Sequence, residues 1–207
     1  MVYLKYWSSP LLSTERLVYN LDMSYNSAAT RARLLDAAYA EFADRGFAGA
    51  RVSRIASESG SNKQAIYLYF ASKEGLFDAV LEDRLGVLAD QVPYTPDDLT
   101  GYIGALFDHI VEHPELVRLT QWKQLERPDA TDMELNSHVS KAEALARALG
   151  VDDARGMDAL MLTLAMAQAW NTTSPSLRSM NQSPDLRLRQ HRASLVAGVA
   201  AVINDLQ

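Results

Sequence analysis

The 207-residue chain contains no cysteine. This absence excludes disulfide scaffolds, cysteine-liganded zinc, iron–sulfur clusters and cysteine nucleophiles. No stretch approaches the roughly 18 consecutive apolar residues that a membrane-spanning helix needs. The first residues also lack the charged, apolar and cleavage regions of a secretory signal peptide. We therefore expect a cytoplasmic protein without a membrane partner.

Patterns for catalysis and cofactor binding are also scarce. The chain has only four histidines, and it contains no glycine-rich phosphate loop and no nucleophile-elbow sequence. His109 and His113 are four residues apart, a spacing that suits a metal on one helical face. No third ligand is evident, and Pro114 disfavours helical geometry at His113. The sequence predicts no enzymatic activity, no cofactor and no metal site.

Charge is unevenly distributed along the chain. The net charge is −6 overall, but residues 25–80 carry +1 and residues 81–207 carry −7. A near-neutral segment can still present a basic face to a nucleic acid. The asymmetry indicates two regions with different tasks.

Apolar residues recur at three- and four-residue steps, the period of amphipathic helices, and no alternating strand pattern competes. The sequence therefore predicts an all-α fold. Helices are expected at residues 29–45, 52–59, 63–69, 73–91, 97–112, 114–126, 132–148, 152–172 and 185–205. Asn62 and Ser72 are suitable N-caps. Residues 1–24 show no sustained period and are expected to be a disordered extension, or to lie largely before a true initiator at Met23.

Two short helices around Gly60 form the pattern of a helix-turn-helix. In that motif the second helix enters the major groove of DNA and the first crosses the backbone. The second helix exposes Lys63 and Gln64, which can read base edges, and Tyr67 and Tyr69, which can bond to phosphate. The same pattern occurs in helical proteins that do not bind DNA, where the tyrosines would be packing residues and the lysine a solvated charge.

Residues 50–56 (ARVSRIA), Gly60 and residues 66–77 (IYLYFASKEGLF) resemble the DNA-binding domain of the TetR family of transcriptional regulators. The resemblance covers about residues 29–81 and includes Gly46-Phe47. It implies a homodimeric repressor that binds palindromic double-stranded DNA and is released by a small-molecule effector. It also implies a helix-turn-helix domain over residues 25–72 and a helical effector-binding and dimerisation domain over residues 73–207.

The resemblance implies phosphate contacts for Tyr67 and Lys73, and contacts to bases or backbone from the second helix. The full set of predicted DNA-binding residues is Arg51, Ser53, Arg54, Asn62, Lys63, Gln64, Tyr67, Tyr69 and Lys73. Two positions depart from the family pattern. Ala50 and Arg51 stand where a Ser or Thr cap is common, and Leu68 stands where an aromatic residue is common. Both departures leave the operator sequence open.

The C-terminal region offers apolar residues with a few polar groups, the composition of a ligand pocket. The predicted effector residues are Phe107, Gln121, Trp122, Met161 and Trp170. Each of them could equally be ordinary core. The helices over residues 152–172 and 185–205 are expected to form the dimer surface, and one face of each could also pack within the monomer.

Two alternatives stay open at this stage. The protein could bind DNA without an inducer or activate transcription. It could also be a helical ligand-binding or enzymatic protein that retains the helix-turn-helix only as a scaffold. The second alternative predicts no affinity for DNA above a non-specific background.

Overall fold

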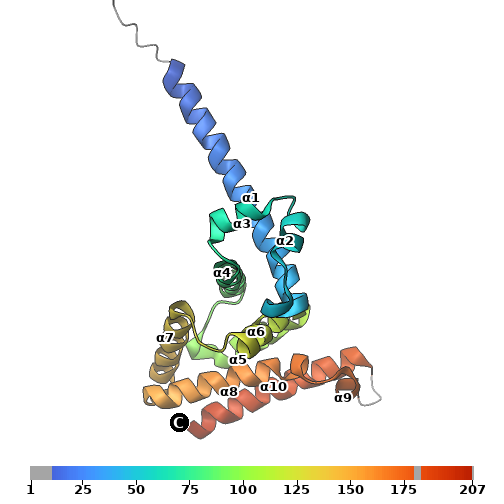
Figure 1. The fold of residues 1–207 in the computed structure, drawn as a ribbon. Coiled ribbons are helices and arrows are strands. Elements are labelled where there is room, and N and C mark those ends of the chain that lie inside the picture. Colours follow the sequence, from blue (N-terminus) through green and yellow to red (C-terminus); the bar gives the residue numbers. More distant parts are fainter. Residues whose placement is uncertain (1–10, 180–182, 207) are drawn as a thin grey trace, which may run out of the picture. The chain divides into compact units, whose positions relative to one another are not determined.

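The computed structural model describes the backbone of residues 11–179 and 183–206 and the side chains from Ser27 onward within these ranges. Every regular element in these ranges is helical, which confirms the all-α prediction (Figure 1). The elements are α1 (Leu11–Gly49), α2 (Val52–Glu58), α3 (Lys63–Phe70), α4 (Lys73–Gln91), the 3-10 helix η1 (Pro96–Asp98), α5 (Leu99–Glu112), α6 (Pro114–Glu126), α7 (Asp132–Leu149), α8 (Asp153–Thr172), α9 (Pro175–Ser179) and α10 (Pro184–Leu206).

Two parts of the helix prediction differ from the structure. Helix α1 begins at Leu11, whereas residues 1–24 were expected to be disordered. The stretch over residues 11–27 contains neither glycine nor proline, so nothing in it interrupts a helix. Residues 1–10 lie outside the described residues. The short α9 was also missed; it begins at Pro175, and proline is well tolerated in the first turn of a helix.

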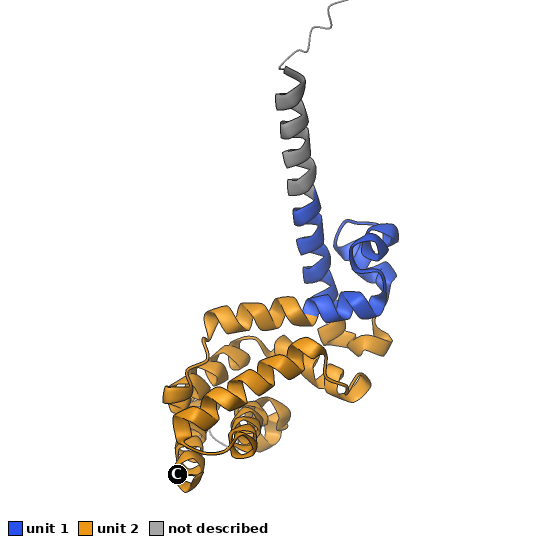
Figure 2. Ribbon diagram, turned by 90° about the vertical axis from the view of Figure 1, so that its left-hand side faces the viewer, with its two compact units in different colours: residues 1–41, 51–80 blue, residues 42–50, 81–207 orange. Residues whose placement is uncertain are grey.

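The chain divides into two compact units, coloured separately in Figure 2. Unit 1 comprises residues 1–41 and 51–80, and unit 2 comprises residues 42–50 and 81–207. The boundary therefore falls inside α4 after Val80 rather than at its start. The first part of α4 carries the fully buried Leu76 and Phe77, and such apolar side chains belong to a core rather than to a linker.

The core of unit 1 draws side chains from all four of its helices. Leu34 and Ala38 of α1, Ile55 of α2, Ile66 of α3 and Phe77 of α4 have no exposed surface. Burying one large apolar side chain stabilises a fold by about 1.5–3 kcal/mol. This shared core therefore fixes the orientation of α2 and α3.

The core of unit 2 is a cluster to which α5, α8 and α10 contribute. Its members include Phe107 of α5, Leu160 and Ala167 of α8, and Leu195 of α10. Leu160 and Ala167 lie on the helix that was expected to form part of a dimer surface, yet they pack within the unit. Leu164 also packs against the cluster from its half-buried position. The monomer core therefore uses apolar residues of α8 that recur at four- and three-residue steps.

Candidate nucleic-acid interface

Helices α2 and α3 of unit 1 form the predicted helix-turn-helix. The turn between them passes through Gly60, whose φ of +65° is favourable for glycine. Asn62 caps α3, because its side-chain oxygen accepts a hydrogen bond from the backbone N–H of Ala65 at 2.8 Å. This confirms the cap that the sequence predicted. The turn and the cap fix the residue at which α3 begins and hence which side chains face outward.

Helix α3 has one buried face and one exposed face. Ile66 and Phe70 lie on the buried face. Gln64, Leu68 and Tyr67 are exposed, and Tyr67 exposes 51% of its surface. A helix turns by about 100° per residue, so Leu68 lies about 160° from both core residues. The outward face thus presents an amide, an apolar and a phenolic side chain together.

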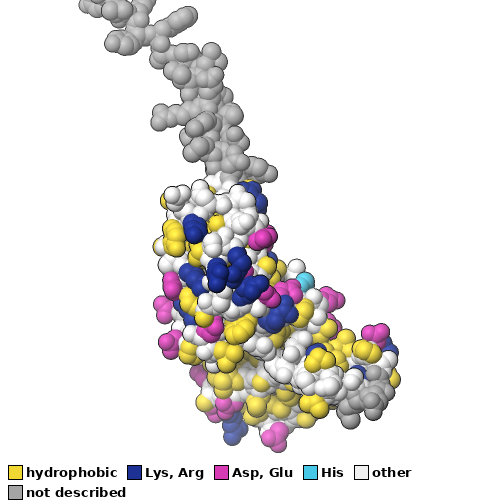
Figure 3. Space-filling view, turned by 45° about the vertical axis from the view of Figure 1, so that its right-hand side comes forward, with side chains coloured by type: hydrophobic (Ala, Val, Ile, Leu, Met, Phe, Trp, Pro, Cys, Tyr) yellow, Lys and Arg dark blue, Asp and Glu magenta, His cyan; other side chains and the backbone are white. Residues whose placement is uncertain are grey.

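Lys63 is exposed at the first turn of α3. On the face that Figure 3 shows, several Lys and Arg side chains lie close to one another. Exposed positive charge suits contacts with the phosphates that flank a major groove.

Tyr69 has a different environment from Tyr67. It is half-buried, and its hydroxyl lies 2.9 Å from the hydroxyl oxygen of Ser27 in α1, a hydrogen-bond distance. Its ring also contacts Phe70 at 6.1 Å between ring centroids. The structure therefore gives Tyr69 a position that braces α3 against α1.

The start of α2 is tied to α1 through Glu41. Oε1 of Glu41 accepts hydrogen bonds from the backbone N–H of Arg51 and from Nε of Arg54, each at 2.8 Å. Arg51 has no side-chain cap on α2, in line with the expected departure from the family pattern. Glu41 thus satisfies the backbone N–H of the N-cap residue itself, as the Glu or Gln of a capping box does, and not the first-turn N–H groups that a capping Ser or Thr would satisfy. Arg54, predicted to contact DNA, is thus bound within unit 1, and its side chain is 34% exposed.

Ser53 is exposed on α2, and Asn62 is exposed although its side chain caps α3. Lys73 is half-buried at the start of α4 and takes part in a contact of its own. Ser72 accepts a hydrogen bond from the N–H of Gly75 at 3.0 Å, which confirms the predicted cap of α4. The predicted DNA-binding residues thus all lie in unit 1, where Arg54 is bound to Glu41 and Tyr69 to Ser27.

Two arginines of α1 contact residues of the helix-turn-helix, although they are not among the predicted DNA-binding residues. Arg33 is exposed and donates from Nε to the carbonyl oxygen of Ser59 at 3.4 Å and from Nη2 to Oγ1 of Thr30 at 3.1 Å. Arg31 places its guanidinium 5.4 Å from the centre of the Phe70 ring, a cation–π contact. Both arginines lie on the polar positions of α1, so helical periodicity alone could not distinguish them from solvated charges.

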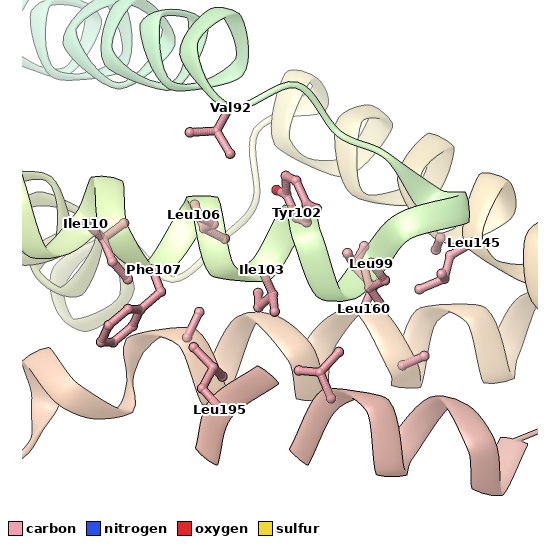
Figure 4. Close-up of a cluster of buried hydrophobic side chains, with 14 of the residues drawn as sticks. Val92, Leu99, Tyr102, Ile103, Leu106, Phe107, Ile110, Leu145, Leu160 and Leu195 are labelled. Carbon is pink, nitrogen blue, oxygen red and sulfur yellow. The ribbon is translucent and has the colours of Figure 1, made fainter. Parts of the chain in front are cut away.

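The predicted effector residues lie in unit 2 but do not form one group. Phe107 is buried in the core cluster (Figure 4), and Trp170 packs against that cluster. Both rings contact His191, at 5.7 Å and 5.1 Å between ring centroids. Met161 is 52% exposed and so lines no enclosed site in this chain.

The two other predicted effector residues lie on α6, where Gln121 is half-buried. Trp122 faces the end of α1, since a Cβ added at Gly46 would meet its ring at 2.8 Å. Glu126 of α6 also accepts a hydrogen bond from the N–H of Ala48 at 3.0 Å. In unit 2, therefore, Trp122 holds residues 42–50 rather than facing Phe107 and Trp170.

His191 is a residue that sequence analysis missed. Its Nε2 atom is buried and has no hydrogen-bond partner among the described residues. Burial lowers the pKa of His191 below the ordinary value of 6.5, and the positive charge of Arg187 lowers it further. An imidazole held neutral between two aromatic rings is suited to contacting a ligand through a hydrogen bond. No sequence motif surrounds His191, so only its contacts identify it.

The histidine pair of α5 lies at the junction with α6. The rings of His109 and His113 are 4.5 Å apart between centroids, and Nδ1 of His113 lies 3.6 Å from Oε1 of Glu115. Within the described residues, no three His, Asp or Glu side chains come together as metal ligands. None of the described helices combines the length and the apolar character required to cross a membrane.

Known protein families match both units. The family profile described as "Bacterial regulatory proteins, tetR family" matches residues 34–80. A second profile, "Tetracyclin repressor-like, C-terminal domain", matches residues 98–200. The first match contains the helix-turn-helix, and the second contains the cluster of α5, α8 and α10.

The chain is also similar to individual regulators. It is 40% identical over 158 residues to the HTH-type transcriptional repressor SCO4008 of Streptomyces coelicolor, covering 72% of this chain and 82% of the relative. It is 33% identical over 103 residues to the HTH-type transcriptional repressor NicS of Pseudomonas putida, covering 46% of this chain and 49% of that relative.

Among solved structures, the chain matches the transcriptional regulator SCO4942 from Streptomyces coelicolor with a TM-score of 0.69 and 33% sequence identity. The match covers 82% of this chain and 96% of that one. The similarity thus extends through both units and agrees with the resemblance first seen in residues 29–81. The chain belongs to the TetR family of helix-turn-helix transcriptional regulators.

Proposed function

We propose that the protein is a ligand-responsive repressor that binds a palindromic operator as a homodimer and is released by a small molecule. The observation that carries the proposal is the outward face of α3. There the exposed Lys63, Gln64, Tyr67 and Leu68 lie on the second helix of a helix-turn-helix. Such a face suits insertion into the major groove. A repressor of bacterial genes works in the cytoplasm, where its operator lies.

Two features support repression by a dimer. The relatives SCO4008 and NicS are both named as repressors. Helix α8 also exposes 52% of Met161 and 52% of Leu162, and α10 exposes 40% of Leu186. Large exposed apolar side chains are favourable in an interface between subunits. In such a dimer, two copies of α3 would enter successive major grooves about 34–36 Å apart.

Release by a ligand requires that unit 2 influences unit 1, and two helices pass from one unit into the other. Helix α4 passes from unit 1 into unit 2 after Val80, and α1 does so after Glu41. Within unit 2, Trp122 and Glu126 of α6 hold the end of α1. A shift of α6 would therefore move the end of α1, which leads directly into α2.

An effector changes operator affinity only if it binds the two conformations with different affinities. We propose that it contacts the aromatic group of Phe107, Trp170 and His191, where a buried imidazole nitrogen has no partner among the described residues. Aromatic walls with one polar atom match the composition of small-molecule sites.

Selection of bound duplexes from a random DNA pool tests the proposal. The purified protein is used at about 0.15 M salt, where exposed charges are screened beyond roughly 8 Å. We expect an enriched palindrome whose half-sites are about 10–10.5 base pairs, or a multiple of that, from centre to centre. No enrichment from folded, dimeric protein would contradict the proposal and favour a scaffold role for the helix-turn-helix. The enriched duplex then serves to screen small molecules for release.

A further inference from the structure

Leu68 is the most exposed large apolar side chain among the described residues. It exposes 82% of its surface in the second half of α3, a helix of eight residues. In contrast, Ile66 and Phe70, which lie on the buried face of α3, are 0% and 7% exposed. Leu68 therefore does not contribute to the core of unit 1, and its exposure to water is unfavourable in the free protein.

The position of Leu68 on the helix is as informative as its exposure. It lies about 160° around the helix from both Ile66 and Phe70, so it points directly away from the core. Gln64 lies one turn earlier on the same outward strip, because residues four apart share a helical face. Lys63 and Tyr67 lie to one side of this strip. Around the helix axis, Leu68 thus lies on the midline of the outward face, and the basic Lys63 lies to one side of it.

The major groove offers one apolar group at the base edges, the C5-methyl group of thymine. All other features there are hydrogen-bond donors or acceptors, which a leucine cannot satisfy. Phosphates and sugars also offer nothing that an isobutyl group can recognise. A leucine at the centre of a groove-facing strip therefore has one favourable partner in B-DNA.

We propose that Leu68 is a specificity-determining residue that contacts a thymine methyl group in each half-site of the operator. This inference rests on the proposed function, since it requires that α3 enters the major groove. The outward strip then reads two chemically different features: Gln64 reads a base edge by hydrogen bonds, and Leu68 reads a methyl group by apolar contact.

The test replaces thymidine by deoxyuridine, which lacks only the methyl group and keeps the same hydrogen bonds. Each thymine of the selected half-site is replaced in turn, symmetrically in both halves, and the dissociation constant is measured. Burial of one methyl-sized group contributes about 0.8 kcal/mol, so one contact corresponds to roughly four-fold in affinity. We expect a loss of roughly ten- to twenty-fold at one symmetric pair of positions when both contacts are removed.

The variant Leu68→Ala and the deoxyuridine substitution together form a double-mutant cycle. It should bind the thymidine duplex about as weakly as the wild-type protein binds the deoxyuridine duplex, and it should discriminate between the two duplexes by less than about two-fold. Because Leu68 is exposed, the variant should keep its thermal stability. Leu125→Ala is the matched control, since Leu125 is 75% exposed on α6 in unit 2; this variant should retain the full deoxyuridine effect.

Three outcomes would overturn the role of Leu68 while leaving the proposed function intact. They are a selected half-site without thymine, equal affinity for every deoxyuridine duplex, and a deoxyuridine effect that persists in Leu68→Ala. In contrast, the absence of any enriched duplex would remove the proposed function itself. The two failures are therefore distinguishable in one series of measurements.

Discussion

The hydroxyl groups of Tyr69 in α3 and Ser27 in α1 lie 2.9 Å apart, at hydrogen-bond distance across 42 residues of sequence. This contact joins the second helix of the helix-turn-helix to the helix that precedes the motif. The neighbouring Tyr67 exposes 51% of its surface and makes no hydrogen bond through its hydroxyl to any described residue. Two tyrosines on one short helix therefore have separate roles.

These roles predict opposite effects of removing each hydroxyl group. Tyr69→Phe should lower the free energy of unfolding by about 0.5–1.5 kcal/mol, the net contribution of one hydrogen bond. Tyr67→Phe should leave stability within about 0.5 kcal/mol and weaken DNA binding instead. Urea unfolding and operator titration of both variants check this. An unchanged operator affinity for Tyr67→Phe would exclude a phosphate contact from its hydroxyl.

Lys63 should contribute to the salt dependence of DNA binding. The logarithm of the affinity falls with the logarithm of the salt concentration, with a slope of about −0.9 for each phosphate contact. If the ammonium group of Lys63 contacts a phosphate, Lys63→Gln should make this slope shallower by about 0.9 for each subunit. The loss should be similar for specific and non-specific duplexes, because phosphates carry no sequence information. Arg147→Gln, at an exposed position near the end of α7, is the matched loss of one charge and should leave the slope unchanged.

Gly46 and Gly60 have similar positive φ values, +68° and +65°, but different surroundings. Gly60→Ala meets no atom within 4 Å, so it should cost only the backbone strain of about 1–2 kcal/mol. At Gly46 the ψ of 178° is also suited almost only to glycine, and an added Cβ would meet the Trp122 ring at 2.8 Å. Gly46→Ala should therefore cost about 3 kcal/mol or more.

Urea unfolding at fixed protein concentration measures both glycine variants. Adding Trp122→Ala should reduce the cost of Gly46→Ala and leave that of Gly60→Ala unchanged, because only Gly46 lies against the indole. Equal costs in both backgrounds would show that Trp122 does not hold the end of α1.

His191 should make the fold less stable at acidic pH. Its pKa is lowered in the folded state by burial and by Arg187, so the unfolded chain binds the proton more readily. Stability attributable to this histidine is then fully present above its ordinary pKa of 6.5 and is lost as the pH falls toward the folded value. The pKa of His109 is lowered too, and it contributes in the same direction.

The check is the difference in unfolding free energy between pH 7.5 and pH 5.5. We expect a smaller difference for His191→Gln than for the wild-type protein. His138→Gln, on the exposed side of α7, is the control and should behave like the wild type. An unchanged pH dependence in His191→Gln would contradict a neutral imidazole with a buried Nε2 atom.

The helix-turn-helix was accessible to sequence analysis because its signals are local. Gly60 marks the turn, Asn62 caps α3 and Ser72 caps α4, and each acts within three or four residues of its position. The predicted helix at residues 114–126 also agrees with α6 at both ends, since Pro114 begins the helix and Pro128 follows its end. Capping residues and proline set the ends of helices through local geometry, so these ends can be predicted without knowledge of tertiary packing.

The contacts of the site depend on residues far apart in sequence, and these were not predictable. Whether Tyr69 faces DNA or Ser27 depends on how α3 packs against α1, which a helical period does not specify. The same holds for Trp122, whose neighbour Gly46 lies 76 positions earlier, and for His191, which meets two rings from other helices.

If the outward face of α3 reads the bases of an operator, a change at Gln64 must alter the DNA sequence that the protein selects. Random-pool selection is carried out in parallel with the wild-type protein and with Gln64→Ala. A glutamine in the major groove pairs with adenine through two hydrogen bonds, each such pair being worth about 1–3 kcal/mol of discrimination. We predict that Gln64→Ala selects the same palindrome with one symmetric pair of positions relaxed. An identical motif at all positions would contradict base reading by this face of α3.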